Sequence, residues 1–149
     1  MKKKILVSII VNCFNGERFL AEALDSVINQ TYQNWELIFW DNQSSDNSSE
    51  IFKSYKHPNF NYFYAPNHTH LGRARELAFK RTNGHWIGFL DCDDIWLPEK
   101  LHDQVSVIKS FDGNLGLIYS KCDFFRYRLN VNKKVTRESS IKPSNYMPS

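Results

Sequence analysis

Apolar residues occur in this chain in two alternating patterns, as short continuous runs and as longer stretches with helical spacing. The continuous runs are residues 5–11, 35–40, 60–65 and 86–90. Between the first two runs, over residues 19–28, apolar side chains recur every three or four positions, which is typical of an amphipathic helix. Continuous apolar runs are typical of parallel strands covered on both faces. The pattern therefore predicts buried strands joined by helices.

The later part of the chain continues this alternation. Helices are expected after Asp46, over residues 73–81, and from Pro98, which would lie in the first turn of its helix. A fifth strand is expected from residues 116–120 onward, running toward Arg126. Alternating strands and helices predict an α/β fold with a mostly parallel, Rossmann-like sheet and helices on both faces.

Polar residues directly follow three of the predicted strands. They are residues 12–15, 41–42 and 91–94. The carboxyl ends of parallel strands meet at one rim of a sheet, where open α/β sheets bind ligands. The three carboxylates in the last group suit a hard divalent cation such as Mg²⁺ or Mn²⁺, which often shares its coordination with substrate phosphates. We therefore expect a nucleotide diphosphate and a divalent cation at this rim.

Length and charge narrow the class of protein. A chain of 149 residues has room for one domain with a substantial core. Its formal charge of +3 is mild and comes in part from residues 2–4, so nucleic acid is not expected as a partner. The run 5–11 is too short for a secretory signal, and no apolar stretch approaches the length of a membrane span. A cytoplasmic location is the resulting expectation.

The cysteines suggest no function on sequence grounds. Cys13, Cys92 and Cys122 are odd in number and lack the paired spacing of a zinc site or a redox dithiol. Two carboxylates flank Cys92 and are expected to raise its pKa, which argues against a reactive thiolate. All three are therefore predicted to be reduced and without a role in chemistry.

Five segments, taken together and in order, resemble the large inverting glycosyltransferase family with the GT-A fold, family 2-like. They are residues 8–16, 26–32, 40–46, 71–75 and 89–98. The resemblance extends from about Val7 to Phe124. It implies a nucleotide-diphospho-sugar transferase fold, with a donor-binding domain over residues 1–127. Residues 128–149 would then begin an acceptor region, and the last ten or so are expected to be poorly ordered.

The resemblance also implies roles for residues at the first two strand ends. Asn12, Phe14 and Asn15 would contact the nucleotide, with Phe14 in a position where the family usually has Tyr. Asp41 and Asn42 would contact the base and ribose, with Asn42 in place of a second Asp. An amide can both accept from an imide N–H and donate to a carbonyl, so this change still permits a uracil base.

Further positions match the part of the family's site that holds the diphosphate. Arg75 would contact the diphosphate or the base edge, because a guanidinium suits both. Asp91, Cys92 and Asp93 correspond to the DXD motif, with Cys92 close to the donor. Asp93 is the expected direct ligand of Mn²⁺ or Mg²⁺, Asp91 lies toward the ribose or the metal's water shell, and Asp94 has a supporting role.

The function that the resemblance implies is transfer of a sugar, with inversion, from a nucleotide-diphosphate donor, expected to be a UDP-sugar. The acceptor would be a saccharide or a lipid-linked saccharide in cell-surface polysaccharide synthesis. The catalytic base is expected beyond residue 149, so this chain would be the donor-binding half of the enzyme and nearly inactive alone. A lipid-linked acceptor would allow the longer protein to associate peripherally with the inner face of the membrane. The sequence indicates no oligomeric state.

Several other interpretations fit single motifs. The acidic cluster of residues 91–94, taken alone, is also typical of a solvated turn. Arg75 could equally be an exposed helix residue that pairs with a neighbouring acid. Asp91 could be the nucleophile of a haloacid-dehalogenase-like phosphatase, and the chain could be a noncatalytic nucleotide-sugar-binding module. The residues His68 to His70 could clip a metal, but a surface loop with two solvated imidazoles is favoured.

Overall fold

The computed structural model describes residues 4–113, 115–122, 126–129 and 135–138. They belong to two compact units, residues 1–112 and 113–149. In the second unit, strands β5 (Arg126–Leu129) and β6 (Val135–Glu138) form an antiparallel pair. The predicted disorder of the last ten residues lies outside the described residues. Within the described part of the chain, no helix has the length and apolar character needed to cross a membrane.

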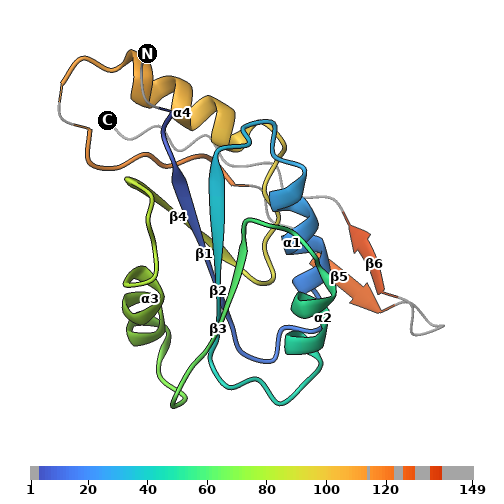
Figure 1. Ribbon diagram of the computed structural model, residues 1–149. Helices are drawn as coiled ribbons and strands as arrows, with labels where there is room; N and C mark the ends of the chain where they lie inside the picture. The colour runs from blue at the N-terminus through green and yellow to red at the C-terminus, as the bar shows by residue number, and fades with distance from the viewer. Residues whose placement is uncertain (1–3, 114, 123–125, 130–134, 139–149) are drawn as a thin grey trace. The chain divides into compact units, whose positions relative to one another are not determined.

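The first unit is built on a four-stranded parallel sheet with strand order β3-β2-β1-β4 (Figure 1). Its strands are β1 (Val7–Cys13), β2 (Trp35–Asp41), β3 (Phe60–Tyr64) and β4 (Trp86–Asp91). The first three strands follow one another in one direction, and β4 returns to the other side of β1. The strand order therefore reverses between β1 and β4, and such a switch point is where open α/β sheets bind ligands.

Helices cover both faces of this sheet, as predicted. They are α1 (Leu20–Ile28), α2 (Ser48–Ser54), α3 (Leu71–Phe79) and α4 (Lys100–Ser110). One hydrophobic cluster joins alternate residues of β1 and β2 to α1, α2 and α4, and a second joins the other face of the sheet to α3. Figure 1 shows α3 on the side of the sheet opposite α1 and α2. Side chains at successive strand positions therefore enter different cores.

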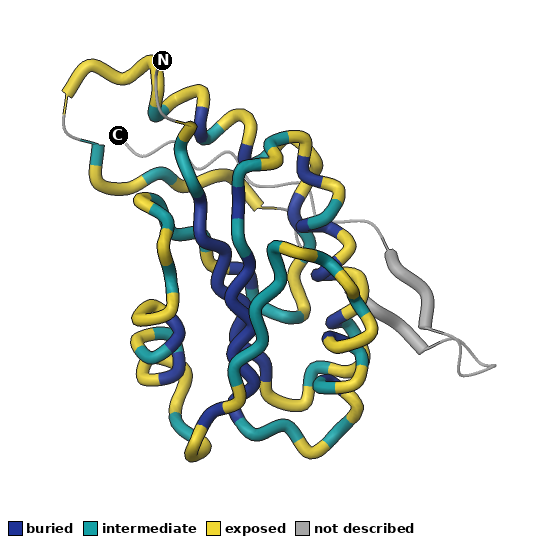
Figure 2. The backbone as a smooth tube through the Cα atoms, viewed as in Figure 1, coloured by how far each residue is buried: buried dark blue, intermediate teal, exposed yellow. Residues whose placement is uncertain are grey.

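The sequence pattern located the central strands correctly but not the edge. All seven residues of β1 are buried, and Figure 2 shows β1 and β2 as the buried centre of the unit. Strand β4 was predicted to be covered on both faces, yet only Leu90 is buried and Phe89 is 49% exposed. Among the described strands of this sheet β4 lies at the edge, and a continuous apolar run does not distinguish an edge strand from a central one.

Two further predictions about the later elements were wrong. Residues 116–120 form no strand, and Leu117 and Tyr119 lie exposed. A short apolar run does not by itself determine whether a strand forms. Pro98 precedes the last helix instead of lying in its first turn, since α4 begins at Lys100. Its carbonyl accepts hydrogen bonds from Thr31, which ties this turn to the end of α1.

Candidate functional site

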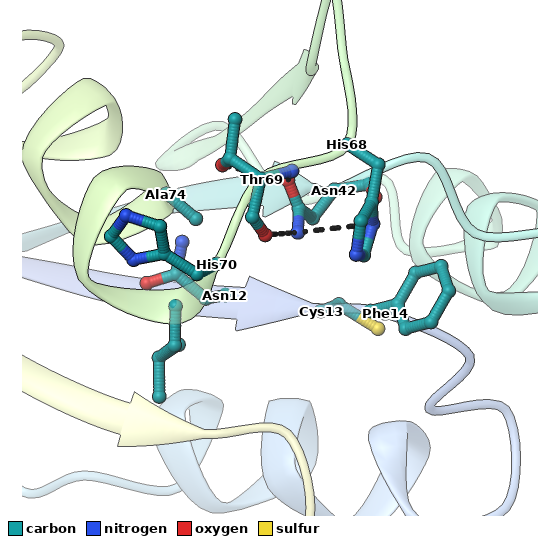
Figure 3. A pocket seen from close by; sticks show the side chains of 9 residues that line it. Asn12, Cys13, Phe14, Asn42, His68, Thr69, His70 and Ala74 are labelled. Carbon is teal, nitrogen blue, oxygen red and sulfur yellow. Dashed lines mark hydrogen bonds between the residues drawn. The ribbon is translucent and has the colours of Figure 1, made fainter.

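A cavity of about 260 Å³ opens at the carboxyl ends of β1 and β2 (Figure 3). It is lined by Asn12, Cys13, Phe14, Asn42, His68, Thr69, His70, Leu71 and Ala74. The lining comes from two strand ends, from the segment before α3, and from the first turn of α3. Three residues predicted to bind the donor, Asn12, Phe14 and Asn42, therefore lie together in one cavity wall.

Asn12, which belongs to the lining of this cavity, carries a buried side-chain donor without a partner among the described residues. The residue is 8% exposed, and its Nδ2 has no hydrogen-bond partner in the described part of the chain. A buried donor without a partner costs about 1–3 kcal/mol, so such groups are rare in folded proteins. In the wall of a cavity, the unpaired amide is suited to donating to an acceptor on a bound ligand.

Asn42 holds the segment that closes the other side of the cavity. Its Nδ2 donates to the Thr69 carbonyl over 2.6 Å, and the Thr69 N–H donates back to Oδ1 over 3.1 Å. The backbone carbonyl of Asn42 lies 2.9 Å from Nδ1 of His68. Figure 3 shows the Asn42 side chain between Thr69 and His68. The protein's own loop thus engages the amide that was expected to contact the base, and a direct contact of Asn42 with the ligand stays a prediction.

His68 and His70 are both exposed, as the favoured interpretation of a surface loop expects, and each ring also has a partner within the protein. The His68 ring packs against Phe14, with centroids 4.3 Å apart and planes inclined by 53°. Nδ1 of His70 accepts from the N–H of Arg73 and caps α3, which begins at Leu71 instead of near Arg73. Both histidines were missed as cavity residues, because nothing in their local sequence indicates that this loop lies over the strand ends.

Asp41 and Asn15 stand at the strand ends but do not line the cavity. The carboxylate of Asp41 is fully buried and accepts from the Ser44 N–H at 2.8 Å and from the Tyr62 hydroxyl at 2.7 Å. Burial, with a further contribution from Asp41, raises the pKa of Tyr62 to about 12. Asn15 has a left-handed φ of 54°, and its Oδ1 accepts from the Ser45 N–H. Both side chains join neighbouring loops, and their contacts with a donor stay predictions.

The acidic residues at the end of β4 are paired with a guanidinium from helix α3, and the predicted contact of Arg75 with the diphosphate or the base edge stays a prediction. Arg75 on α3 donates from Nη2 to Asp91 Oδ1 over 2.7 Å, and its guanidinium lies 5.3 Å from the Phe89 ring centroid. The alternative interpretation of Arg75, a helix residue paired with a neighbouring acid, also fits this ion pair, because the Arg75 side chain is partly exposed. Arg73 pairs with Glu76 on the same helix.

Excess negative charge accumulates at the end of β4. Burial raises the pKa of Asp94, and the neighbouring carboxylates of Asp93 and Asp91 raise it further. In the described part of the chain, no three side chains of His, Cys, Asp or Glu are grouped to hold a metal by themselves. Mg²⁺ is commonly held by only one or two carboxylates together with substrate phosphates, so this segment fits a site that the ligand completes.

Cys13 and Cys92 lie side by side, although the sequence suggested no pairing. Each Sγ is 2.8 Å from the place where a Cβ on Gly16 would stand. A hydrogen bond from Cys92 lowers the pKa of Cys13 to about 7, against the opposing effect of burial. The pKa of Cys92 is raised, as predicted, but the hydrogen bond to Cys13 and burial contribute more than the flanking carboxylates.

Comparison with known proteins gives a consistent result. A family model described as Glycosyl transferase family 2 matches residues 8–145. The UDP-Glc:alpha-D-GlcNAc-diphosphoundecaprenol beta-1,3-glucosyltransferase WfgD of Escherichia coli is 36% identical over 132 residues, which are 87% of this chain and 51% of that protein. The chain thus spans about half the length of this curated relative.

Solved structures show the same fold. The S. aureus TarS fragment 1–349 in complex with UDP-GlcNAc has a TM-score of 0.68 at 24% identity, over 81% of this chain and 38% of that one. The mannosyltransferase PcManGT from Pyrobaculum calidifontis, in complex with GDP-Man and Mn²⁺, has a TM-score of 0.65 at 21% identity, over 70% and 32%. The predicted GT-A architecture is therefore confirmed.

Proposed function

This chain belongs to glycosyl transferase family 2, and we propose that it forms the donor-binding part of an enzyme that transfers a sugar, with inversion, from a UDP-sugar to a saccharide or lipid-linked acceptor. The observation on which this rests is the unpaired Asn12 donor in a cavity beside an acidic strand end. We assign donor binding to residues 1–127 and the start of the acceptor region to residues 128–149.

The cavity offers the groups that a nucleoside needs. Phe14 is half exposed and packs against His68, so the two rings present an aromatic surface on which a base can stack. Asn12 supplies an N–H donor beside this surface for a carbonyl of the base or a ribose oxygen. The names of two similar proteins, a glucosyltransferase that uses UDP-Glc and a structure with bound UDP-GlcNAc, support uridine as the nucleoside.

The acidic segment would hold the diphosphate through a divalent cation. One oxygen of Asp91 already accepts from Arg75, which leaves Asp93 as the better direct ligand of Mn²⁺ or Mg²⁺. When bound, the cation offsets the negative charge that develops on the departing diphosphate. Arg75 adds a second positive charge at the same strand end, and its guanidinium can turn from Asp91 to a phosphate oxygen.

A phosphatase with Asp91 as nucleophile is not supported by these findings, because the chain belongs to a glycosyltransferase family and the Asp91 carboxylate is bound to Arg75.

The catalytic base remains an expectation for the region beyond residue 149. A lipid-linked acceptor would bring the longer protein to the inner face of the membrane, with this domain in the cytoplasm. The synthesis of a cell-surface polysaccharide is the process that such an acceptor would serve.

Calorimetric titration tests the proposal. UDP is titrated into the chain with and without Mn²⁺, and CDP and GDP serve as comparison ligands. We expect UDP to bind most tightly, at least about tenfold more tightly with Mn²⁺ than without it. Asp93→Ala should abolish the effect of Mn²⁺, whereas Asp103→Ala, an exposed acid in the first turn of α4, should leave it unchanged.

Each contrary result has a definite meaning. Absence of binding by any nucleoside diphosphate would refute the proposed function. UDP binding that retains its Mn²⁺ dependence in Asp93→Ala would remove Asp93 from the metal site. Rapid sugar transfer by the isolated chain would contradict the assignment of the catalytic base to a region beyond residue 149.

A further inference from the structure

Two strand ends bring a pair of cysteines opposite each other at the switch point of the sheet. Cys13 is the last residue of β1, and Cys92 directly follows β4. In the register of these parallel strands Asn12 stands beside Asp91, and the residue that follows each of them along the chain is a cysteine. Neighbouring strands are about 4.8 Å apart, which lies within the range of Cα separations that disulfides span.

Both thiols also point into the same space. Their side chains belong to the same hydrophobic cluster, on the α1 face of the sheet. Each sulfur lies 2.8 Å from the position of a Cβ on Gly16, so the two sulfurs fill the volume that any other residue at position 16 would need. Because Gly16 has no side chain, both sulfur atoms fit beside it and lie close to each other.

Cys13 can be reached from the cavity, and the chemistry of the proposed sugar transfer uses neither thiol. Cys13 is 2% exposed overall, yet it lines the cavity, and Cys92 is partly buried. Transfer of a sugar from a nucleotide diphosphate breaks and forms bonds to oxygen and requires no thiol. The third cysteine, Cys122, is exposed.

We propose that Cys13 and Cys92 form a reversible disulfide that links β1 to the acidic segment and controls nucleotide binding. The simplest oxidant for this reaction is hydrogen peroxide. The sulfur of Cys13 attacks one peroxide oxygen, giving a sulfenic acid and one water, and the sulfur of Cys92 then displaces the second water. Two thiols and one peroxide thus give one disulfide and two waters, and a small dithiol reverses the change.

The disulfide would affect nucleotide binding by changing the position of the acidic residues beside Cys92. Cys92 lies between Asp91 and Asp93, so a bond from its sulfur to β1 restrains both carboxylates. A strand-to-strand disulfide also requires its own sulfur geometry, which differs from that of two thiols in a hydrogen bond. The acidic segment would then be displaced from the arrangement that completes a metal site with the diphosphate. This effect rests on the proposed function, whereas the disulfide itself does not.

Intact-mass measurement and peptide mapping test the bond. The Cys122→Ser chain, which lacks the exposed thiol, is treated with hydrogen peroxide under native conditions. We expect the loss of two hydrogen atoms and a single linked peptide pair containing Cys13 and Cys92, both reversed by dithiothreitol. The same treatment of Cys92→Ser in that background should give no such loss, and Cys13→Ser serves as a second variant. Oxygen addition to separate cysteines in the Cys122→Ser chain, without a link, would overturn the proposal.

Titration with UDP and Mn²⁺ then tests the control of binding. The oxidised chain should bind at least about tenfold more weakly than the reduced chain, with recovery on reduction. Equal affinity of the two forms would overturn the control of binding. A disulfide in a chain whose reduced form binds no nucleoside diphosphate would instead refute the proposed function and leave the bond established.

Discussion

Arg75 of helix α3 donates to Asp91 at the end of strand β4 over 2.7 Å, and this ion pair connects the helix on one face of the sheet to its edge strand. Both side chains are partly exposed, at 36% and 47%. Partly exposed ion pairs contribute only about 0–1 kcal/mol to stability. The main effect of the pair is therefore to place a positive charge beside the acidic segment, and its contribution to the stability of the fold is small.

Replacement of Arg75 tests this role. Arg75→Gln should weaken UDP binding in the presence of Mn²⁺ by about tenfold, because a charged contact to phosphate is lost. The free energy of unfolding should change by less than about 1 kcal/mol. Arg73→Gln, which removes a guanidinium paired with Glu76 on the same helix, should leave UDP affinity unchanged. Equal affinities of all three chains would show that Arg75 only pairs with Asp91.

The unpaired amide of Asn12 predicts opposite effects on stability and on binding. Asn12→Leu removes a buried donor without a partner, which costs about 1–3 kcal/mol, so stability should stay equal or rise while UDP affinity falls. Asn61→Leu provides the contrast, because its amide donates to the Leu37 carbonyl and its loss should lower stability only. Urea unfolding and calorimetry measure the two quantities. A less stable Asn12→Leu chain with unchanged UDP affinity would contradict the assignment.

The hydrogen bonds of Asn42 predict that this residue positions the cavity wall. Asn42→Ala removes both bonds to the Thr69 backbone, so it should destabilise the chain by about 1–3 kcal/mol and weaken UDP binding. Hydrogen exchange at the Thr69 amide should become faster, which a defect elsewhere would not cause. Thr69→Val keeps the backbone bonds and should have little effect on any of these measurements. Unaltered exchange at Thr69 in Asn42→Ala would refute this role.

Glu36 predicts a dependence of stability on pH. Burial alone would raise the pKa of this carboxyl, but hydrogen bonds from Ser8 and Asn83 outweigh it and lower the pKa below the ordinary value of 4.5. The folded state therefore binds this proton less readily than the unfolded state. The stabilising contribution is full above the unfolded value of 4.5 and is lost as the pH falls through the lower folded-state value.

Glu36→Gln measures that contribution directly. At neutral pH the variant should be less stable by about 1–2 kcal/mol, because the amide replaces one acceptor oxygen by a donor and removes the charge that strengthens the remaining bonds at a partly exposed site. The difference from the natural sequence should shrink as urea unfolding is repeated at lower pH. Asp103→Asn, at an exposed position on α4, should show a smaller difference at neutral pH. A difference for Glu36→Gln that is constant across the acid range would contradict the assigned pKa.

The sequence by itself determined the order of strands and helices in the first unit and the chemistry of its strand ends. Continuous apolar runs such as residues 5–11 and 35–40 and the helical spacing over 19–28 are local patterns, and local patterns encode secondary structure directly. The parallel arrangement follows from their alternation, which places Asn12, Asn42 and Asp91 at one rim without knowledge of any contact.

Only the tertiary structure decided which of these polar residues share a cavity and what they contact. Asn42 is committed to Thr69, Asp41 to Tyr62, and Cys13 lies beside Cys92, and in each case the partner is distant in sequence. The edge position of β4 likewise depends on which strand lies beside it. The packing of the whole sheet determines which distant residues come into contact, and no local pattern of apolar and polar residues contains that information.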